Sequence, residues 1–524
     1  MIEAPIGKTL AAVVAEKAAA MPDHPAILFE DMCISYRDLA DLVQDRARAF
    51  RAQGVGAGDR IGILIGNEPE WVVLALAAAR IGATLVPLNT WYKSSELAWT
   101  IRHCRMKLIV SMTRFLSADY GRMLMQIVRE GQAPCLETLI FIGDPVEGAQ
   151  DFESFLAKGR THPDEEIADV DPESPAFILY TSGSTAEPKG VLLTHRGVVE
   201  NGFELGQRRA IGLDDKVWLG TPLFYALGAT NALPATLTAG ATLVLLGAFE
   251  AGKAIDVVER TGATVYYGTG NMSRAIIDHP GFSLERIKTL KKGNAGLGAE
   301  YKRLTLVEMG ITGAVPAYGL TETYGNAVVG AHDDPLEVKL STEGRALPGQ
   351  EIRVVDPDTG APVPPGELGL ILVRGNVTPG YLDNAEETAK ALRADGFFDT
   401  GDLGTLDGDG RLRFHSRLKE VIKSGGINIS PVEVEQLLAT HPAVRDAHVV
   451  GIEDPVRGQL IVAFVDPLAE TSEKELQAYI KERAASFKVP HHVFLRSEAE
   501  LPRLATGKIA KVKLKEQARE ALAR

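Results

Sequence analysis

The strongest constraint on the fold is a regular alternation of short apolar segments with helical patterns in the first half of the chain. Residues 60–65 form a short apolar segment, 71–80 follow as a helical pattern, and 83–86 resume as a strand. Similar strand-like segments recur at 108–111, 138–142, 241–246 and 263–267. Strands that alternate with helices of this length usually pair in parallel, because the helix carries the chain back across the sheet. The alternation therefore predicts an α/β fold with helical layers around largely parallel sheets.

Two local features predict where elements begin and end in this region. Ser35 precedes a helical stretch that carries Asp38 in its first turn, which is typical of a capping box, and we expect that helix to stop at Gly54. The longest apolar stretch, 71–88, is interrupted by Arg80, Gly82 and Pro87. We therefore interpret it as a buried helix followed by a strand, and we expect no integral membrane segment.

The sequence changes character near Gly349. Residues 351–356 alternate between polar and apolar types, 357–366 are rich in Pro, Gly and Asp, and 370–373 form another apolar strand. This pattern favours antiparallel hairpins, and it predicts a small β-barrel appended to the α/β core.

A further pattern of helices and strands follows Ser416. It predicts a helix near 431–440, strands at 447–452 and 460–465, and a helix at 473–485. About a hundred residues are enough for a separate small α+β domain. We therefore expect an N-terminal domain at 1–416, with a β-rich subregion at 349–416, and a C-terminal domain at 417–524.

Composition excludes several classes of protein. The 524 residues carry 56 Lys and Arg against 69 Asp and Glu, a net charge of −13, which argues against nucleic acid as a partner and against wholesale binding to anionic membranes. The three cysteines, Cys33, Cys104 and Cys135, are widely spaced, which suits a reducing cytosol and excludes a disulfide framework. The N-terminus lacks the pattern of a signal peptide, so we expect a cytoplasmic protein.

One loop carries the clearest chemical signal. Residues 180–190 read Tyr-Thr-Ser-Gly-Ser-Thr-Ala-Glu-Pro-Lys-Gly and follow an apolar strand at 176–179. Small residues let backbone N–H groups approach an anion, hydroxyl groups add donors, and Lys189 adds a positive charge. The Walker spacing is absent, so the pattern indicates a polyphosphate-binding loop of another kind. The alternative is a flexible surface turn between two strands.

This loop resembles the phosphate loop of the adenylate-forming superfamily, which includes acyl-CoA synthetases, firefly luciferase and the adenylation domains of nonribosomal peptide synthetases. Further segments that resemble the motifs of this superfamily occur in its order along the chain, at 318–323, 400–402, 416–420, 423–435 and 502–509. One departure is Ser416, where the family has glycine. The resemblance spans nearly the whole chain.

The resemblance implies a role for each matched residue. Residues implied to bind the nucleotide are Thr181, Ser182, Gly183, Ser184, Thr185, Lys189, Tyr318, Thr321, Asp402 and Arg417. Tyr318 would stack on adenine, Thr321 would meet the α-phosphate, and Asp402 would accept the ribose hydroxyls. The glycine pair Gly425 and Gly426 would approach the nucleotide of coenzyme A.

Three residues are implied to act directly in the reaction, namely Thr185, Glu322 and Lys508. Glu322 would bind Mg²⁺, and Lys508 would bridge carboxylate and phosphate oxygens. Lys419 would be the hinge about which a mobile C-terminal lid turns. The alternatives are that Asp402 only organises its turn, and that Lys419 is one more solvated charge.

The resemblance therefore implies a two-step ligation that uses ATP, Mg²⁺ and coenzyme A. A carboxylate attacks the α-phosphate of ATP, and a thiol then attacks the resulting acyl-adenylate and releases AMP. The partner is a small-molecule carboxylic acid. Two alternatives stay open, namely an adenylation enzyme that loads a separate carrier protein and a nucleotide-binding member of the family without turnover. The sequence leaves the oligomeric state open, with a homodimer as one option.

The acid-binding residues are less clearly marked. Residues 222–228 resemble the P-L-F-H-x-x-G segment of the family, with Tyr225 in place of the commoner His, and Tyr225 either gates the pocket or belongs to the core. No carboxylate lies near this point to hold an ammonium group, so an α-amino acid is disfavoured. The residues expected to line the pocket are Tyr225, Tyr267, Gly296, Gly298 and Gly325. Their aromatic and small side chains, without a nearby Arg or Lys, predict a compact apolar acid, either aryl, alicyclic or medium-chain.

Overall fold

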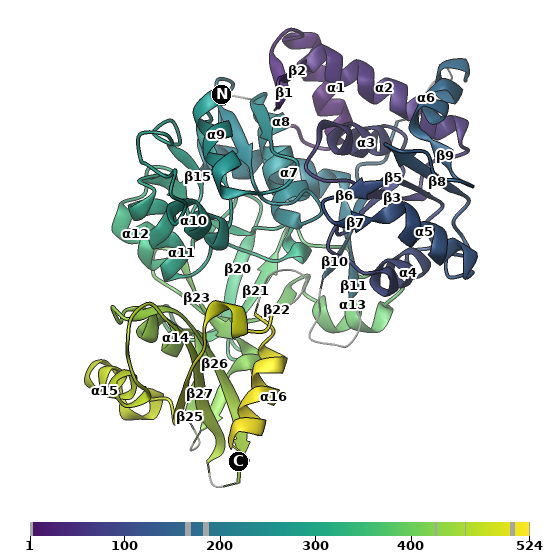
Figure 1. Cartoon of the computed structure of the whole chain (residues 1–524). Coiled ribbons are helices and arrows are strands. Elements are labelled where there is room, and N and C mark those ends of the chain that lie inside the picture. Colours follow the sequence, from purple (N-terminus) through teal and green to yellow (C-terminus); the bar gives the residue numbers. More distant parts are fainter. Residues whose placement is uncertain are drawn as a thin grey trace. The chain divides into compact units, whose positions relative to one another are not determined.

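The chain forms two compact units in the computed structural model. One unit is Met1–Glu351 with Val373–Phe398, and the other is Ile352–Leu372 with Asp399–Arg524 (Figure 1). The structure describes residues 4–162, 169–181, 188–424, 427–455, 457–503 and 509–522. Strands between 399 and 416 belong to the second unit, and the expected domain boundary at 416 stays a prediction.

Two seven-stranded sheets form the framework of the first unit. The first sheet has the order β16 (Gly313–Val315), β15 (Lys292–Asn294), β14 (Val265–Tyr267), β12 (Lys216–Leu219), β13 (Thr242–Leu245), β1 (Pro25–Phe29) and β2 (Met32–Ser35). The second has the order β11 (Lys189–Thr194), β10 (Pro175–Thr181), β4 (Thr84–Pro87), β3 (Arg60–Leu64), β5 (Leu108–Met112), β8 (Thr138–Ile142) and β9 (Gln150–Asp151). Neighbouring strands are parallel except at β1–β2 and β10–β11. The predicted α/β class is confirmed.

Helices cover these sheets and connect their strands (Figure 1). They are α1 (Leu10–Ala20), α2 (Tyr36–Ala52), α3 (Pro69–Arg80), α4 (Ser94–His103), α5 (Tyr120–Arg129), α6 (Phe152–Thr161), α7 (His195–Arg208), α8 (Leu233–Ala239), α9 (Ala251–Thr261), α10 (Gly270–Ile277), α11 (Ala299–Arg303), α12 (Leu336–Ser341) and α13 (Ala385–Ala391). Two short π-helices precede α8 and follow α11, namely η1 (Leu227–Ala232) and η2 (Leu304–Glu308). The predicted capping box of α2 is present, since Ser35 Oγ accepts from the backbone N–H of Asp38 at 3.1 Å.

Helix α3 is buried along nearly its whole length. Its residues from Trp71 to Ala79 are all buried, and they share one core with strand residues from both sheets, such as Ile63 of β3 and Leu243 of β13. Because the helix is apolar around its circumference, it is stable in water only when other elements cover every face. The prediction of a buried helix is confirmed. Among the described residues, no helix is both long and apolar enough to cross a lipid bilayer.

The second unit contains a separate small domain with its own core. Its sheet has the order β25 (Ile427–Ile429), β24 (Ile422–Ser424), β27 (Gly458–Pro467) and β26 (Val444–Asp454), with β28 (His492–Leu495) also paired to β27. Helices α14 (Pro431–Ala439), α15 (Glu473–Arg483) and α16 (Lys511–Leu522) accompany this sheet. The predicted helices at 431–440 and 473–485 correspond to α14 and α15, whereas α16 was not predicted. Ser430 caps α14, and Pro431 is its first residue.

Four strands that are neighbours in one sheet make up most of the region predicted to be β-rich. Strands β20 (Glu351–Val355), β21 (Gly369–Arg374), β22 (Phe398–Leu406) and β23 (Arg411–Arg417) are neighbours in that order. The pairing of β22 with β23 is an antiparallel hairpin with a register shift after Leu403. One antiparallel hairpin of the predicted kind is therefore present, and the small β-barrel stays a prediction.

His195 makes the stability of the first unit depend on pH. It is only 1% exposed at the start of α7, lines a cavity of about 10 Å³ among apolar side chains, and its Nε2 has no hydrogen-bond partner among the described residues. Burial lowers its pKa from 6.5 to about 4, and the charge of Asp171 opposes that shift. The imidazole therefore stays neutral in the folded protein at pH values at which it binds a proton in the unfolded chain.

We expect the free energy of unfolding to fall as the pH is lowered from 6.5 to 4, at a slope of up to about 1.4 kcal/mol per pH unit from this group. His195→Phe keeps an aromatic ring and removes the titration, so its unfolding free energy should decline less over that window. Denaturant unfolding at several pH values measures this difference. The partly exposed His162 provides the control His162→Phe, and equal pH slopes for all three proteins would contradict the assignment.

Candidate functional site

The carboxyl ends of parallel strands come together at one edge of the first sheet. The backbone N–H groups of Gly220 and Thr221, which follow β12, donate to the carbonyl of Tyr267 at 3.1 and 3.3 Å. Asn294, at the end of β15, donates from Nδ2 to the carbonyl of Gly268 at 3.2 Å. Ligands of parallel sheets usually bind at this edge, so these loops form the first part of the candidate site.

The two ends of the predicted phosphate loop meet across the hairpin β10–β11. Thr181 and Lys189 are register partners at the ends of these antiparallel strands. The loop residues between them that carry predicted roles, namely Ser182, Gly183, Ser184 and Thr185, lie outside the described residues. The hairpin therefore fixes where the loop leaves and rejoins the sheet.

A cation–π contact and a hydrogen bond, both made by Tyr381, link Lys189 to Glu322. Lys189 forms an ion pair with Glu387 of α13, and its Nζ lies 5.1 Å from the centroid of the Tyr381 ring. The hydroxyl of Tyr381 donates to Glu322 Oε1 at 2.9 Å. Lys189, predicted to bind the nucleotide, and Glu322, predicted to bind the metal, are thus connected through Tyr381. Neither Tyr381 nor Glu387 was predicted from the sequence. The sequence does mark the position of Glu387 in a helix, because Asn384 is a typical N-cap residue and caps α13 three positions before it.

The charges along this chain of contacts are well defined. Hydrogen bonds from Lys189 and Lys390 lower the pKa of Glu387 from 4.5 to about 2, so its carboxylate is charged at neutral pH. Burial raises the pKa of Tyr381, and the charge of Glu322 raises it further. Tyr381 is therefore a protonated donor at neutral pH, which agrees with its hydrogen bond to Glu322.

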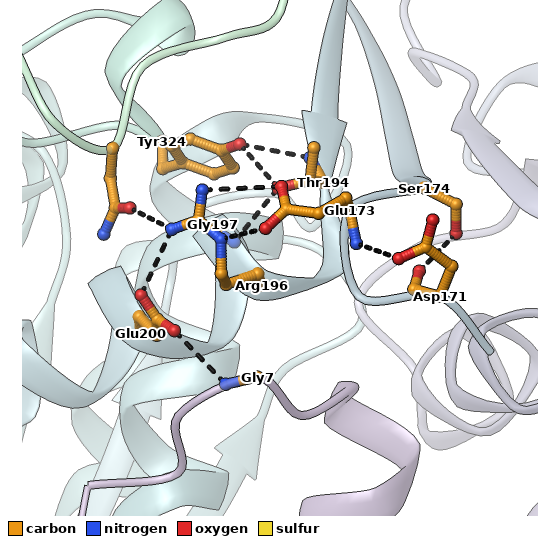
Figure 2. A network of polar contacts seen from close by, with 10 residues as sticks. Gly7, Asp171, Glu173, Ser174, Thr194, Arg196, Gly197, Glu200 and Tyr324 are labelled. Atoms are coloured by element: carbon orange, nitrogen blue, oxygen red, sulfur yellow. Dashed lines mark hydrogen bonds and ion pairs between the residues drawn. The ribbon is translucent and has the colours of Figure 1, made fainter. Parts of the chain in front are cut away.

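Tyr324 supports the turn that carries Glu322. Glu322 lies on a single 3₁₀ turn, Thr321–Thr323, which ends at Tyr324 in a left-handed conformation with φ of 56°. The Tyr324 hydroxyl accepts from the N–H of Thr194 at 3.1 Å, and Figure 2 shows this contact beside Gly197. A Cβ atom at Gly197 would approach the Tyr324 ring to 2.1 Å, so the ring can occupy this place only against glycine.

Arg196 holds the first turn of α7 in place. Figure 2 shows it between Glu173 and Glu200, and its Nη1 lies 3.3 Å from Glu200 Oε2 and 3.0 Å from Asn376 Oδ1. Glu200 Oε1 also accepts from the N–H of Gly7 at 3.2 Å. The hydrogen bond to Glu173 raises the pKa of Arg196. This cluster therefore joins the first turn of α7 to segments far apart in sequence, at Gly7, Glu173 and Asn376.

The remaining nucleotide residues of the first unit fall near the same turn or edge. Tyr318 is in β17 (Ala317–Tyr318), directly before the 3₁₀ turn, and only 2% of it is exposed. Gly296 and Gly298 follow β15, and the N–H of Ala295 donates to the carbonyl of Val315 at 2.9 Å. The two predicted acid-pocket glycines therefore follow a residue that is hydrogen-bonded to Val315, three positions before the predicted adenine residue Tyr318.

Tyr225 lies in a group of aromatic side chains. Its ring centroid is 5.8 Å from that of Trp91 and 4.6 Å from that of Phe224, and its hydroxyl accepts from Asn89 Nδ2 at 3.4 Å. Tyr225 is half-buried, and Trp91 is exposed. Trp91 and Asn89 could not be identified from the sequence, because they come from a segment distant from 222–228 and carry no motif.

The second unit carries two predicted nucleotide residues of its own. Asp402 and Arg417 are register partners in β22 and β23, with Arg417 Nε 3.7 Å from Asp402 Oδ1. Lys419 is exposed on a 3₁₀ turn directly after β23, Leu418–Glu420. Further residues with predicted roles, namely Gly425, Gly426 and Lys508, lie outside the described residues.

Family models identify the class of protein. The model for AMP-binding enzymes matches residues 14–382, and the model for the AMP-binding enzyme C-terminal domain matches residues 433–508. The chain belongs to the AMP-binding enzyme family, the adenylate-forming superfamily that the motifs resemble, and it is an acid–CoA ligase of that family.

Similar proteins cover nearly the whole chain. A 3-[(3aS,4S,7aS)-7a-methyl-1,5-dioxo-octahydro-1H-inden-4-yl]propanoyl:CoA ligase of Rhodococcus jostii is 33% identical and covers 94% of this chain and 95% of its own. The mitochondrial medium-chain acyl-CoA ligase ACSF2 of Macaca fascicularis is 30% identical, covering 98% and 87%. ATP-bound MatB from Rhodopseudomonas palustris is 28% identical in sequence, with a TM-score of 0.85 over 97% of this chain and 98% of its own.

The ion pair between Lys189 and Glu387 predicts an effect on ATP binding. With Lys189 in its predicted role, the Glu387 carboxylate would compete with phosphate for the ammonium group. Glu387→Gln should therefore keep the shape of the contact and lower the KM for ATP by roughly two- to fivefold. Steady-state kinetics at low ionic strength measure this change.

The matched control is Glu386→Gln, which alters the neighbouring carboxylate that pairs with Lys390 at 2.8 Å and should leave the KM for ATP unchanged. The assignment fails if Glu387→Gln raises the KM, or if both variants change it equally.

Proposed function

We propose that the protein joins a compact carboxylic acid to coenzyme A in two steps, with ATP cleaved to AMP and pyrophosphate. The observation that carries this proposal is the link from Lys189 through Tyr381 to Glu322, with the hydroxyl of Tyr381 2.9 Å from Glu322 Oε1. It ties the end of the phosphate loop to the carboxylate proposed to bind the metal. The first step forms an acyl-adenylate, and the second transfers the acyl group to the thiol.

The first step brings two anions together, and the proposed site lowers their repulsion. Lys189 supplies positive charge at the loop, and Thr321 supplies a hydroxyl donor next to Glu322. Preorganised charges of this kind stabilise the transition state because they need no reorganisation during the reaction.

Glu322 fits a role in binding Mg²⁺. Its Oε1 accepts from Tyr381, and its Oε2 has no hydrogen-bond partner within the described ranges. A carboxylate oxygen is a suitable ligand for this hard cation, which usually binds through one or two carboxylates together with phosphate oxygens. Bound there, Mg²⁺ would neutralise charge on the phosphates.

The acid is proposed to be aryl, alicyclic or medium-chain. Support comes from the aromatic group at Tyr225 and from the fully buried Tyr267. It also comes from relatives that act on such acids, since the Rhodococcus jostii enzyme acts on a propanoate that carries a bicyclic dione. A structure of the anthranilate CoA ligase AuaEII, 25% identical with a TM-score of 0.88, contains anthranoyl-AMP.

Free coenzyme A is proposed as the acceptor thiol, and the cytoplasm as the location. The described cysteines are free thiols, which suits a reducing compartment. A homodimer is the assembly to test by light scattering.

A panel of acids tests the proposal. Aryl, alicyclic and medium-chain acids should each be screened for carboxylate-dependent exchange of labelled pyrophosphate into ATP, and then for acyl-CoA formation with free coenzyme A. Exchange followed by acyl-CoA supports the ligase. Exchange without acyl-CoA indicates a carrier protein as the acceptor, and no exchange with any acid contradicts the proposal.

Lys508 is proposed to act in the first step only. Lys508→Ala should reduce pyrophosphate exchange by roughly 10²–10³, because a preorganised charge on the phosphate is lost. Thioester formation from supplied acyl-adenylate should change little. Lys513→Ala, at an exposed lysine of α16, is the control and should match the wild type in both assays. Equal loss in both half-reactions of Lys508→Ala would rule out this assignment.

Lys419 is proposed as the hinge about which residues 417–524 rotate between the two steps. Lys419→Pro fixes one φ angle in the 3₁₀ turn after β23, and it should slow thioester formation more than pyrophosphate exchange. Separate assays of the half-reactions measure the two rates. Unchanged rates in both assays would refute the hinge.

A further inference from the structure

Arg209 is a buried cation that lacks a counter-ion. It follows α7 as the C-cap residue and is 0% exposed. No carboxylate forms an ion pair with it in the part of the chain that the structure describes. Its Nη2 lies 3.3 Å from Asn326 Oδ1, whereas Nε and Nη1 have no hydrogen-bond partner there. Such donors are costly to bury without an acceptor.

Other buried cations of the first unit are better matched. Lys302 forms an ion pair with Glu343 at 2.6 Å and also donates to the carbonyl of Thr342 at 2.7 Å. Lys339 donates to the carbonyls of Thr312 and His332 at 2.8 and 2.6 Å. Arg209 differs from both because two of its three side-chain nitrogens have no acceptor among the residues that the structure describes.

The side chains around Arg209 use up their own acceptors. Asn326 Oδ1 accepts from Arg209 and also from Asn231 Nδ2 at 2.7 Å. Asn231 Oδ1 accepts from the hydroxyl of Tyr267 at 3.2 Å. The cluster is therefore left with unused guanidinium donors and needs an acceptor from outside it.

This cluster lies against two residues proposed to line the acid pocket. The guanidinium carbon of Arg209 is 5.0 Å from the centroid of the Tyr267 ring. A Cβ atom built on Gly325 would be 3.1 Å from Asn231 Nδ2, and Gly325 directly precedes Asn326. The cluster with the unused donors is therefore next to residues proposed to line the acid pocket.

We propose that Arg209 and Asn326 form a polar end of the acid pocket, and that the natural acid carries a second acceptor oxygen, a ketone or a carboxylate, remote from the reacting carboxyl group. This inference rests on the proposed function and narrows its substrate class. The guanidinium is positively charged at any physiological pH, so either kind of oxygen receives a charge-assisted hydrogen bond.

Three acids with one carbon skeleton test the inference. They are cyclohexylpropanoate, the same acid with a ring ketone, and the same acid with a ring carboxylate. In the wild type, kcat/KM for one of the two acceptor-bearing acids should exceed that for the plain acid by at least about tenfold. The better of the two identifies the acceptor as ketone or carboxylate.

Arg209→Met keeps much of the side-chain length and removes every donor. It should abolish the preference for the acceptor-bearing acid, while kcat/KM for the plain acid should be equal to or higher than that of the wild type. Arg209→Lys keeps the charge but loses the planar donor group, so it should reduce the preference for the acceptor-bearing acid. It replaces Arg209→Met in the test if Arg209→Met does not fold. Lys339→Met removes a buried cation elsewhere and should retain the preference.

The inference is overturned if the wild type treats the three acids equally or prefers the plain one, or if a folded Arg209 variant keeps the wild-type ratio. Measuring the Tm of the protein with each acid distinguishes failure of this inference from failure of the proposed function. If no acid of this set and none of the panel of aryl, alicyclic and medium-chain acids is turned over, the ligase proposal fails. In that case the polar pocket end is still supported if an acceptor-bearing acid raises the Tm of the wild type more than the plain acid does, and if this difference is lost in Arg209→Met. An equal rise in Tm with all three acids would overturn it.

Discussion

The burial of α3 is the constraint on which the first unit depends. Its residues from Trp71 to Ala79 offer no polar face, so sheet strands and helices must cover it together. The polar end of the helix is held separately, because Glu70 pairs with Arg46 of α2 at 2.9 Å. One continuous core thus includes residues of both sheets, and it holds the hairpin β10–β11 and the carboxyl edge of the first sheet on one scaffold.

Charge in the site is local and differs from the charge of the chain as a whole. The protein carries a net charge of −13, which repels a polyanion such as ATP at long range. Near the loop, Lys189 is balanced by Glu387, whereas the buried Arg209 is balanced by no described carboxylate. The ion pair suits a lysine that exchanges its carboxylate partner for phosphate when the nucleotide binds. The buried arginine suits a site in which the ligand supplies the missing acceptor.

Patterns local in sequence were predicted well, and contacts distant in sequence were not. The capping box at Ser35, the buried helix α3 and the cap of α14 all depend on residues within a few positions of one another. Lys189 and Glu387 are 198 positions apart, so no local pattern joins them. The expectation that the acid pocket contains no Arg or Lys was based only on the segments around the predicted pocket residues. Arg209 reaches Tyr267 from the end of a different helix.

The sequence by itself determined the fold class, the family and the order of the chemical motifs, because periodicity, capping and motif spacing are properties of neighbouring residues. Only the tertiary structure decided which side chains meet. It paired Lys189 with Glu387, joined Tyr381 to Glu322, and buried Arg209 beside Tyr267 and Asn326. The physical reason is that burial and counter-ions depend on every element packed around a group, and packing brings together residues that the sequence keeps far apart.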